Sequence, residues 1–340
     1  MNQYHDSITL LEEKATPLVV ESLYQHGLLS QNGREKGLAY LNPHQNWGYW
    51  ISNILLILGW VFILSGIIYF FAFNWHKMSS YYKFSSIQVL ILVCLAGAWA
   101  YEIDNLRGKL FLTGGCVLIG VFLAVFGQIY QTGADSYQLF LAWTLIITPL
   151  VLIGQFAPLW AIWLLLINLT VIFYWQQDFL PTKNHQYYLY VILLGINSIS
   201  LMVREWLYNR KVDCLQGRWH RILLCIALLM ISFIPMTLFI MDNNFTNPSL
   251  FISALVGYCL QMSFLYHYRY YMRDQWVFAL TVMSLSVITC EIGYQILDKF
   301  VKNDVLNYLL LTLVVLGIFS GSAYLLRKTS QRRATWQVAP

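Results

Sequence analysis

Long apolar runs separated by short polar segments dominate this chain. Each run holds about 18 to 22 residues, enough to cross a hydrocarbon core of about 30 Å as an α-helix. The runs lie near residues 50–73, 85–101, 110–130, 138–154, 158–175, 187–206, 221–241, 249–270, 276–297 and 305–326. The alternating pattern of strand barrels is absent from the sequence. The pattern therefore predicts an all-α polytopic membrane protein with about ten transmembrane helices.

The ends of the chain are more polar than its middle. Residues 1–46 show short helical patterns, in which Gly27 suits a helix end and Ser30 a new start. We expect a cytoplasmic helical head at 1–46, a membrane domain at 47–327 and a basic cytoplasmic tail at 328–340. The head has no apolar core followed by a small-residue cleavage site, so we expect it to survive in the mature protein. It is either a packing cap on the membrane domain or a docking site for a partner.

The composition agrees with a polytopic membrane protein, and the distribution of basic residues predicts how the chain is oriented in the membrane. Only 11% of residues are charged, 58% are hydrophobic, and mean hydropathy is +0.56. With the amino terminus inside, sixteen of the 21 Lys and Arg residues fall on the inner side. Because positive residues are retained in the cytoplasm, both termini are predicted to be cytoplasmic. The net charge of +5 then faces anionic inner-leaflet headgroups, and a nucleic-acid role is excluded.

No motif for catalysis, metal or cofactor binding is present in the sequence. The six cysteines lack CxxC spacing and, apart from Cys214, fall within apolar runs, as expected of small buried hydrophobes. His76, His185 and His267 are scattered, without a second ligand at metal-binding spacing. GxSxG, P-loop, HExxH and dinucleotide signatures are missing. We predict no metal and no cofactor, and an enzyme is the third choice of function.

The stretch from Lys109 to Trp143 predicts a close contact between two helices. Small side chains recur every three or four residues along it, and residues so spaced share one helix face. This predicted helix-packing face includes Gly120, Ala124 and Gly127. Such a face lets another helix approach closely in a bilayer. At the end of the stretch Gln128, Gln131 and Asp135 gather where the chain turns; Asp135 is either a ligand contact or the cap of the next helix.

Three segments carry a resemblance to a known family. They are GLLSQNG in the head, FAFNWHKMSSYYKF at 71–84 and GQIYQTGADSYQLFLAW at 127–143. Together they resemble the bacterial predicted membrane protein family called domain of unknown function 2157, over the head and the first four to five spans. The resemblance implies a bacterial inner-membrane protein without an assigned activity, and it supplies no catalytic residues.

Glu291 is the acidic residue placed deepest within an apolar run. An ionisable group in hydrocarbon normally faces protein or water, so Glu291 is a candidate ligand or proton site. Thr281, Ser284 and Gln295 lie along the same side of its predicted helix. We hypothesise that this stripe and the cluster of Gln128, Gln131 and Asp135 line one periplasm-facing polar cavity. The alternative is that Glu291 holds helices together through a hydroxyl or an amide.

These observations leave two functions open. The first is a non-enzymatic envelope accessory or scaffold component, supported by the head and the small-residue faces. The second is a permease or channel-like carrier of a small solute, with Glu291 as its proton or cation site. The expected partners are the lipid bilayer and a membrane protein or a second copy of the chain. A polar cleft reaching the bilayer midplane would favour the carrier, whereas a stripe far from Gln131 would favour the scaffold.

Overall fold

In the computed structural model every regular element is helical within the residues that it describes. These are residues 17–41, 47–73, 78–131, 133–182, 184–210, 217–242, 247–272, 274–301 and 303–336. His76, Cys214, residues 1–16 and 42–46 of the predicted head, and residues 337–340 of the predicted tail lie outside this description. The all-α class predicted from the sequence is confirmed.

The chain divides into two compact units, Met1–Met78 and Ser79–Pro340. The first holds α2 (Pro17–Gln25), α3 (Gln31–Leu41) and α4 (Trp47–Phe73). The second holds α5 (Ser80–Ala100), α6 (Leu106–Tyr130), α7 (Ser136–Gly154), α8 (Ala157–Tyr174), α9 (Tyr188–Asn209), α10 (Arg218–Met241), α11 (Pro248–Tyr266), α12 (Gln275–Phe300) and α13 (Asp304–Trp336). Two short π-helices, η2 (Trp175–Phe179) and η4 (His267–Tyr271), extend α8 and α11.

Ten described helices are long and apolar enough to cross a membrane, as the sequence pattern predicts. Their ends differ from the prediction by a few residues, because an apolar run marks the part of a helix in the membrane and does not mark its terminal residues. Thus α5 begins at Ser80 rather than near residue 85, and α13 continues to Trp336. Residues 328–336 of the predicted tail are therefore helical.

The head helices α2 and α3 form a hairpin. Gly27 adopts a positive φ of 72° after α2, a conformation that glycine accepts without strain. The guanidinium of Arg34 donates two hydrogen bonds to the carboxylate of Glu21, at 2.8 and 3.0 Å, and lies over the Tyr24 ring. The helix end at Gly27 therefore lies where the sequence predicts it.

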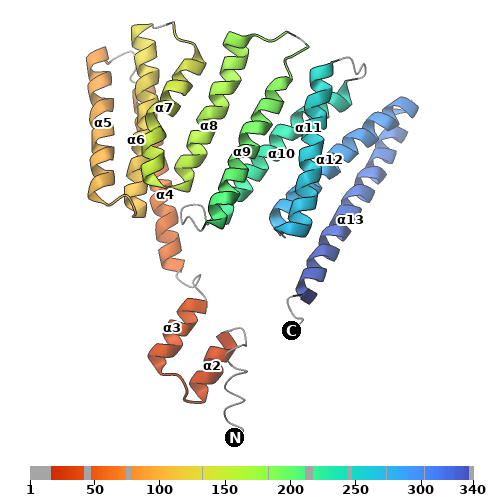
Figure 1. Cartoon of the computed structure of the whole chain (residues 1–340), viewed down its shortest axis with the longest axis horizontal. Coiled ribbons are helices and arrows are strands. Elements are labelled where there is room, and N and C mark those ends of the chain that lie inside the picture. The colour runs from red at the N-terminus through yellow and green to blue at the C-terminus, as the bar shows by residue number, and fades with distance from the viewer. Residues whose placement is uncertain are drawn as a thin grey trace. The chain divides into compact units, whose positions relative to one another are not determined.

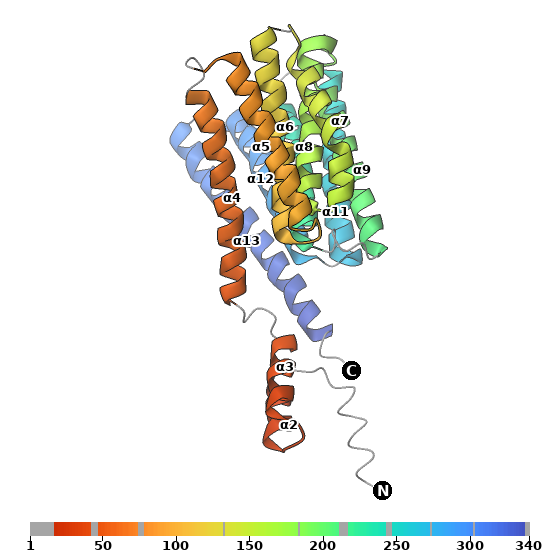
Figure 2. The same ribbon diagram turned by 90° about the vertical axis from the view of Figure 1, so that its left-hand side faces the viewer.

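In the second unit the helices follow one another in chain order as a row, with α10, α12 and α13 tilted from the others (Figures 1 and 2). Helix α10 also packs against α8 and α12, and α11 packs against α9. Besides a smaller cluster of Met236, Ala254 and Ile288, two large hydrophobic cores hold the described helices together. One is built from α5 to α8 around Leu112, Ile147 and Leu159. The other is built from α8 to α12 around Leu228 and Phe278. Helix α8 contributes to both cores, so it joins the two halves of this unit.

Candidate functional site

The predicted helix-packing face lies against α7. The indole of Trp143 covers Gly120, where an added Cβ would come within 2.3 Å of the ring. The Trp143 Nε1–H donates to the carbonyl of Cys116 at 2.8 Å, which fixes the ring in place. Next to this contact Gly120 and Ala124 line a cavity of about 390 Å³ together with residues of α7. Gly127 is half-buried near the end of α6.

The polar end of this stretch is exposed. Gln128, Gln131 and Asp135 all have exposed side chains. Gln131 ends α6 in the left-handed region, with φ at 44°. Asp135 occupies the N-cap position of α7 with an extended backbone, and its side chain makes no capping hydrogen bond. The structure thus places these three side chains at the surface of one turn.

Glu291 is half-buried on α12 and contacts the neighbouring helix α10. The hydroxyl of Thr237 donates to Glu291 Oε2 at 2.9 Å. Gln295, one turn further along α12, is also half-buried. Glu291 therefore has a neutral hydrogen-bond donor on a neighbouring helix.

Polar contacts continue along the same helices toward their middle. Gln261 of α11 is fully buried, and its Nε2 donates to the hydroxyl of Ser232 on α10 at 2.9 Å. The Ser284 hydroxyl of α12 donates to Gln261 Oε1 at 3.2 Å. We call Ser232, Thr237, Gln261, Ser284 and Glu291 the α10–α12 polar seam. Its amide and hydroxyl groups connect three helices.

The structure does not bring the seam and the cluster of Gln128, Gln131 and Asp135 together. Helix α6 packs against α5 and α7, whereas α12 packs against α10, α11 and α13. Figure 1 shows α6 and α12 toward opposite sides of the row, with α8 and α9 between them. The α10–α12 polar seam and the cluster of Gln128, Gln131 and Asp135 therefore do not line one common cavity.

A network of charged side chains at the other end of the helices was missed by the sequence reasoning. Glu205 of α9 accepts two hydrogen bonds from the guanidinium of Arg221 on α10, at 2.7 and 2.8 Å. Arg204 donates to Glu205 at 2.6 Å and to the carbonyl of Gly217 at 3.0 Å. Both arginines are buried and lie over the ring of Tyr208. We call this group, with Arg218 and Asp274, the α9–α12 charge network.

Asp274 connects this network to α12. Its carboxylate, 5% exposed, accepts hydrogen bonds from Arg218 at 2.9 and 3.3 Å and lies 3.6 Å from Arg221 Nη1. It also caps α12 by accepting from the Trp276 N–H at 3.0 Å. Burial by itself raises the pKa of this carboxyl, but the bonds and charge of Arg218 and the backbone N–H groups outweigh it, so the pKa lies below its ordinary value.

A signal for this network was present in the sequence. Arg218 and Arg221 are three residues apart at the start of an apolar run, so they lie on one helix face. Arg204 and Glu205 end the preceding run. The positions of these charged residues along the chain indicate a side of the membrane, but they do not show which residues contact each other.

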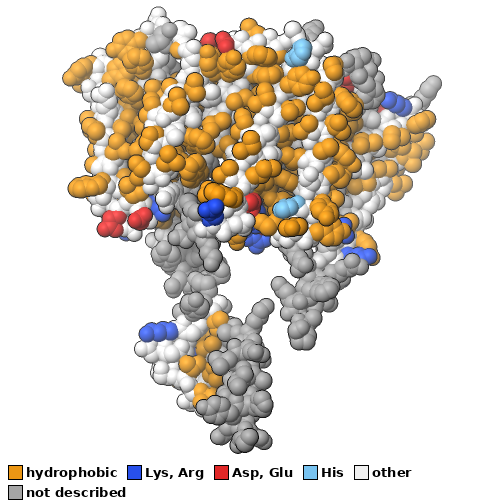
Figure 3. All heavy atoms as spheres, in the orientation of Figure 1, with side chains coloured by type: hydrophobic (Ala, Val, Ile, Leu, Met, Phe, Trp, Pro, Cys, Tyr) orange, Lys and Arg blue, Asp and Glu red, His pale blue; other side chains and the backbone are white. Residues whose placement is uncertain are grey.

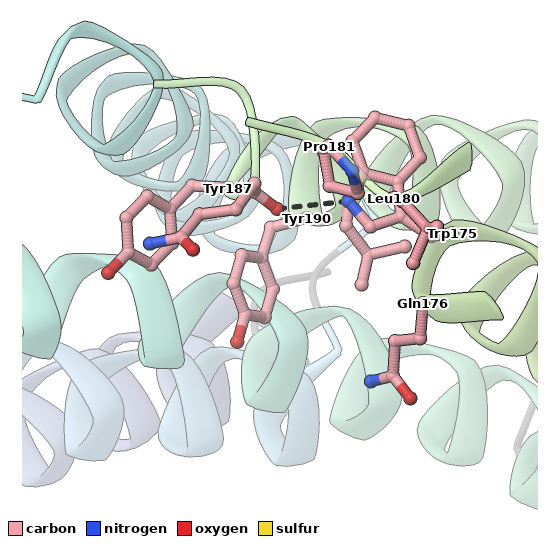
Figure 4. Close-up of a pocket in the computed structure, with 8 residues that line it drawn as sticks. Trp175, Gln176, Leu180, Pro181, Tyr187 and Tyr190 are labelled. Carbon is pink, nitrogen blue, oxygen red and sulfur yellow. Dashed lines mark hydrogen bonds between the residues drawn. The ribbon is translucent and has the colours of Figure 1, made fainter. Parts of the chain in front are cut away.

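A pocket lies where α8 is followed by α9, at the opposite end of α9 from Arg204 (Figure 4). Its volume is about 550 Å³. The residues that line it are Trp175, Gln176, Leu180, Pro181, Gln186, Tyr187, Leu189 and Tyr190. They come from η2, the following loop and the first turn of α9, so one helix connection supplies the whole lining.

Comparison with known proteins gives a partial match. Residues 21–160 match a family model described as a predicted membrane protein (DUF2157). The match confirms the resemblance carried by the three segments in the head and at 71–84 and 127–143. It extends from α2 to the beginning of α8. No curated protein and no solved structure matches the chain.

Proposed function

We propose that this multi-pass membrane protein is a non-enzymatic accessory or scaffold component of the bacterial inner membrane, with both termini in the cytoplasm, and that it works through a membrane-protein partner. One observation carries the proposal: polar groups of the α10–α12 polar seam bond to one another across helix interfaces. Hydrogen bonds of this kind between membrane helices hold a bundle together.

The surroundings of Glu291 support a structural role over a transport role. A carrier needs an acid or amide that is able to exchange its partner for a solute. Glu291 instead accepts a hydrogen bond from Thr237, and both polar ends of Gln261 are engaged by serines. Because these bonds connect α10, α11 and α12, exchanging them for a solute would loosen the bundle.

The head supports action through a partner. The α2–α3 hairpin is closed by the Arg34–Glu21 ion pair, so it presents a defined surface. Leu28, in the turn between its helices, is 72% exposed. A large apolar side chain at the tip of a polar hairpin is a suitable anchor for another protein.

The distribution of charge supports the orientation. In the second unit most of the visible Lys and Arg side chains gather along one edge of the helices (Figure 3). The α9–α12 charge network lies at this end of α9. Since basic residues are retained in the cytoplasm, this edge is the inner one.

The test is native mass spectrometry of the full chain, tagged at its carboxyl end and gently extracted from its host membrane. We expect a second polypeptide in stoichiometric amount, lost when residues 1–46 are deleted. Leu28→Ser should weaken its retention at least about fivefold, the effect of losing one buried apolar anchor. Gln31→Ser, a change at another exposed head residue, is the matched control.

Two outcomes would contradict the scaffold. One is a chain that carries no partner before and after the head is removed. The other is a chain that retains a small molecule which Glu291→Gln abolishes. The second outcome would instead support a small-solute permease that uses Glu291.

A further inference from the structure

We infer that the α8–α9 pocket binds a neutral, hydroxyl-rich group such as a sugar ring at the periplasmic face. The pocket, its lining chemistry and its backbone support this inference. Its placement at the periplasmic face rests on the orientation proposed above, whereas binding does not depend on the proposed partner. Its volume of about 550 Å³ lies within the range of pockets that hold small ligands.

The lining offers hydrogen bonds without charge. Among the eight residues that line the pocket, two glutamines and two tyrosines bear polar side chains, and none of the eight is ionic. In the described part of the chain, no side chain is hydrogen-bonded to the amides of Gln176 and Gln186 or to the hydroxyls of Tyr187 and Tyr190. Amide and phenol groups both donate and accept, as sugar hydroxyls do. Among the described residues of this lining, a charged ligand would find no counter-charge.

The walls of the pocket are fixed by bonds that leave these polar groups available. The Trp175 Nε1–H donates to the carbonyl of Gln186 at 3.2 Å, the dashed line of Figure 4, and its ring stacks on Phe179. The Ser253 hydroxyl of α11 donates to the carbonyl of Tyr187 at 2.7 Å. Figure 4 shows the side chains of Gln176 and Tyr190 extending in the same direction from two sides of the pocket. The backbone around the site is thus held in place before a ligand binds.

The backbone here departs from regular geometry. Helix α8 widens into the π-helix η2, a feature that is frequent at functional sites. Leu180 then adopts φ of 42° and ψ of 63°, the left-handed region that a leucine enters only at a cost. This geometry turns the chain so that Gln176, Leu180 and Tyr190 face one cavity.

The test uses the full chain in nanodiscs of phosphatidylethanolamine and phosphatidylglycerol, prepared with a sugar-free detergent because maltoside detergents carry the probe's own headgroup. Saturation-transfer NMR measures binding of maltose, with glucuronate as the charged comparison. We expect maltose to bind, and Tyr190→Phe and Gln176→Leu each to weaken binding about fivefold, the effect of one lost hydrogen bond. Tyr258→Phe and Gln88→Leu, exposed residues of the same types on α11 and α5, should leave binding unchanged.

A second arm distinguishes a lipid headgroup from a free sugar. The protein is released from nanodiscs that contain glucosyl diacylglycerol, inside the mass spectrometer. The amount of glucosyl diacylglycerol that stays bound to the protein is compared with the amount of bound phosphatidylglycerol. Preferential retention that is lost in Tyr190→Phe assigns the site to a glycolipid headgroup, whereas variant-sensitive binding of maltose alone assigns it to a free sugar. The inference is overturned if both pocket variants match their controls with both probes, or if glucuronate binds as tightly as maltose.

Discussion

The role of an acidic residue in this protein depends on what the neighbouring helix places beside it. Glu291 was singled out by its depth in an apolar run, yet the side chain that it meets is the neutral hydroxyl of Thr237. Asp274, just before α12, meets Arg218 and Arg221. Among the described acids, Asp274 and Glu205, near the ends of apolar runs, are the ones paired with buried arginine.

Asp274→Asn should lower the thermal stability of the purified protein at pH 7, by about 2 kcal/mol, because it leaves Arg221 without one of its partners and weakens the cap of α12. The folded pKa of Asp274 lies below the ordinary value of 3.8, so its contribution is present above that value and is lost as the pH falls through the folded pKa. The melting temperatures of both proteins, measured from pH 7 to pH 3, should therefore begin to converge below about pH 4. A constant difference down to pH 3 would contradict this origin.

Gly120→Ala tests the closest contact between α6 and α7. The new Cβ would come within 2.3 Å of the Trp143 ring, so the helices must separate, at a cost of about 1–3 kcal/mol. The melting temperature should fall. Gly195→Ala on α9 meets no atom within 4 Å, so it should leave the melting temperature unchanged or raise it slightly. Equal effects at both positions would mean that Trp143 is free to move away.

At the scale of elements, the second unit is two packed groups of helices joined through α8 and α9. The joint carries a reciprocal pair of amides. Asn197 Nδ2 donates to Asn168 Oδ1 at 2.7 Å, and Asn168 Nδ2 to Asn197 Oδ1 at 3.4 Å. Asn197 is 2% exposed. The sequence showed two isolated polar residues within spans, and the structure shows that they meet.

Replacing both asparagines should cost less than the sum of the single changes. Asn168→Leu and Asn197→Leu each leave a partner amide unsatisfied, whereas the double variant leaves neither. We expect a coupling of about 0.6–1.7 kcal/mol in a double-mutant cycle, measured by reversible unfolding in mixed detergent. Additive effects would indicate that the two amides act separately.

At the scale of the whole molecule, the family match covers one part of the chain and the newly described features lie in another. The match ends at residue 160. The α8–α9 pocket, the α10–α12 polar seam and the α9–α12 charge network all follow that point. The family model therefore bears on residues 21–160, from α2 to the beginning of α8, and the later helices must be interpreted from their own contacts.

The proposed orientation predicts a difference in labelling between the two ends of the membrane domain, and the sides named here are those of that proposal. Lys299→Cys, at the outer end of α12, should react with a membrane-impermeant maleimide on intact spheroplasts. Arg327→Cys, on α13 at the inner side, should react only after the membrane is opened. Both side chains are exposed, so access depends on the side of the membrane. The parent chain sets the background from its own cysteines, and the reverse pattern would invert the proposed topology.

The sequence by itself determined the class of this protein and the ten described helices that are long and apolar enough to cross a membrane. These properties depend on single segments, because the length and apolarity of each segment decide whether it can cross the bilayer. Only the tertiary structure decided that Thr237 meets Glu291, that Gln261 joins three helices and that Glu205 meets Arg221. Such contacts depend on how each helix is rotated and shifted against its neighbours, and packing over the whole bundle sets that register.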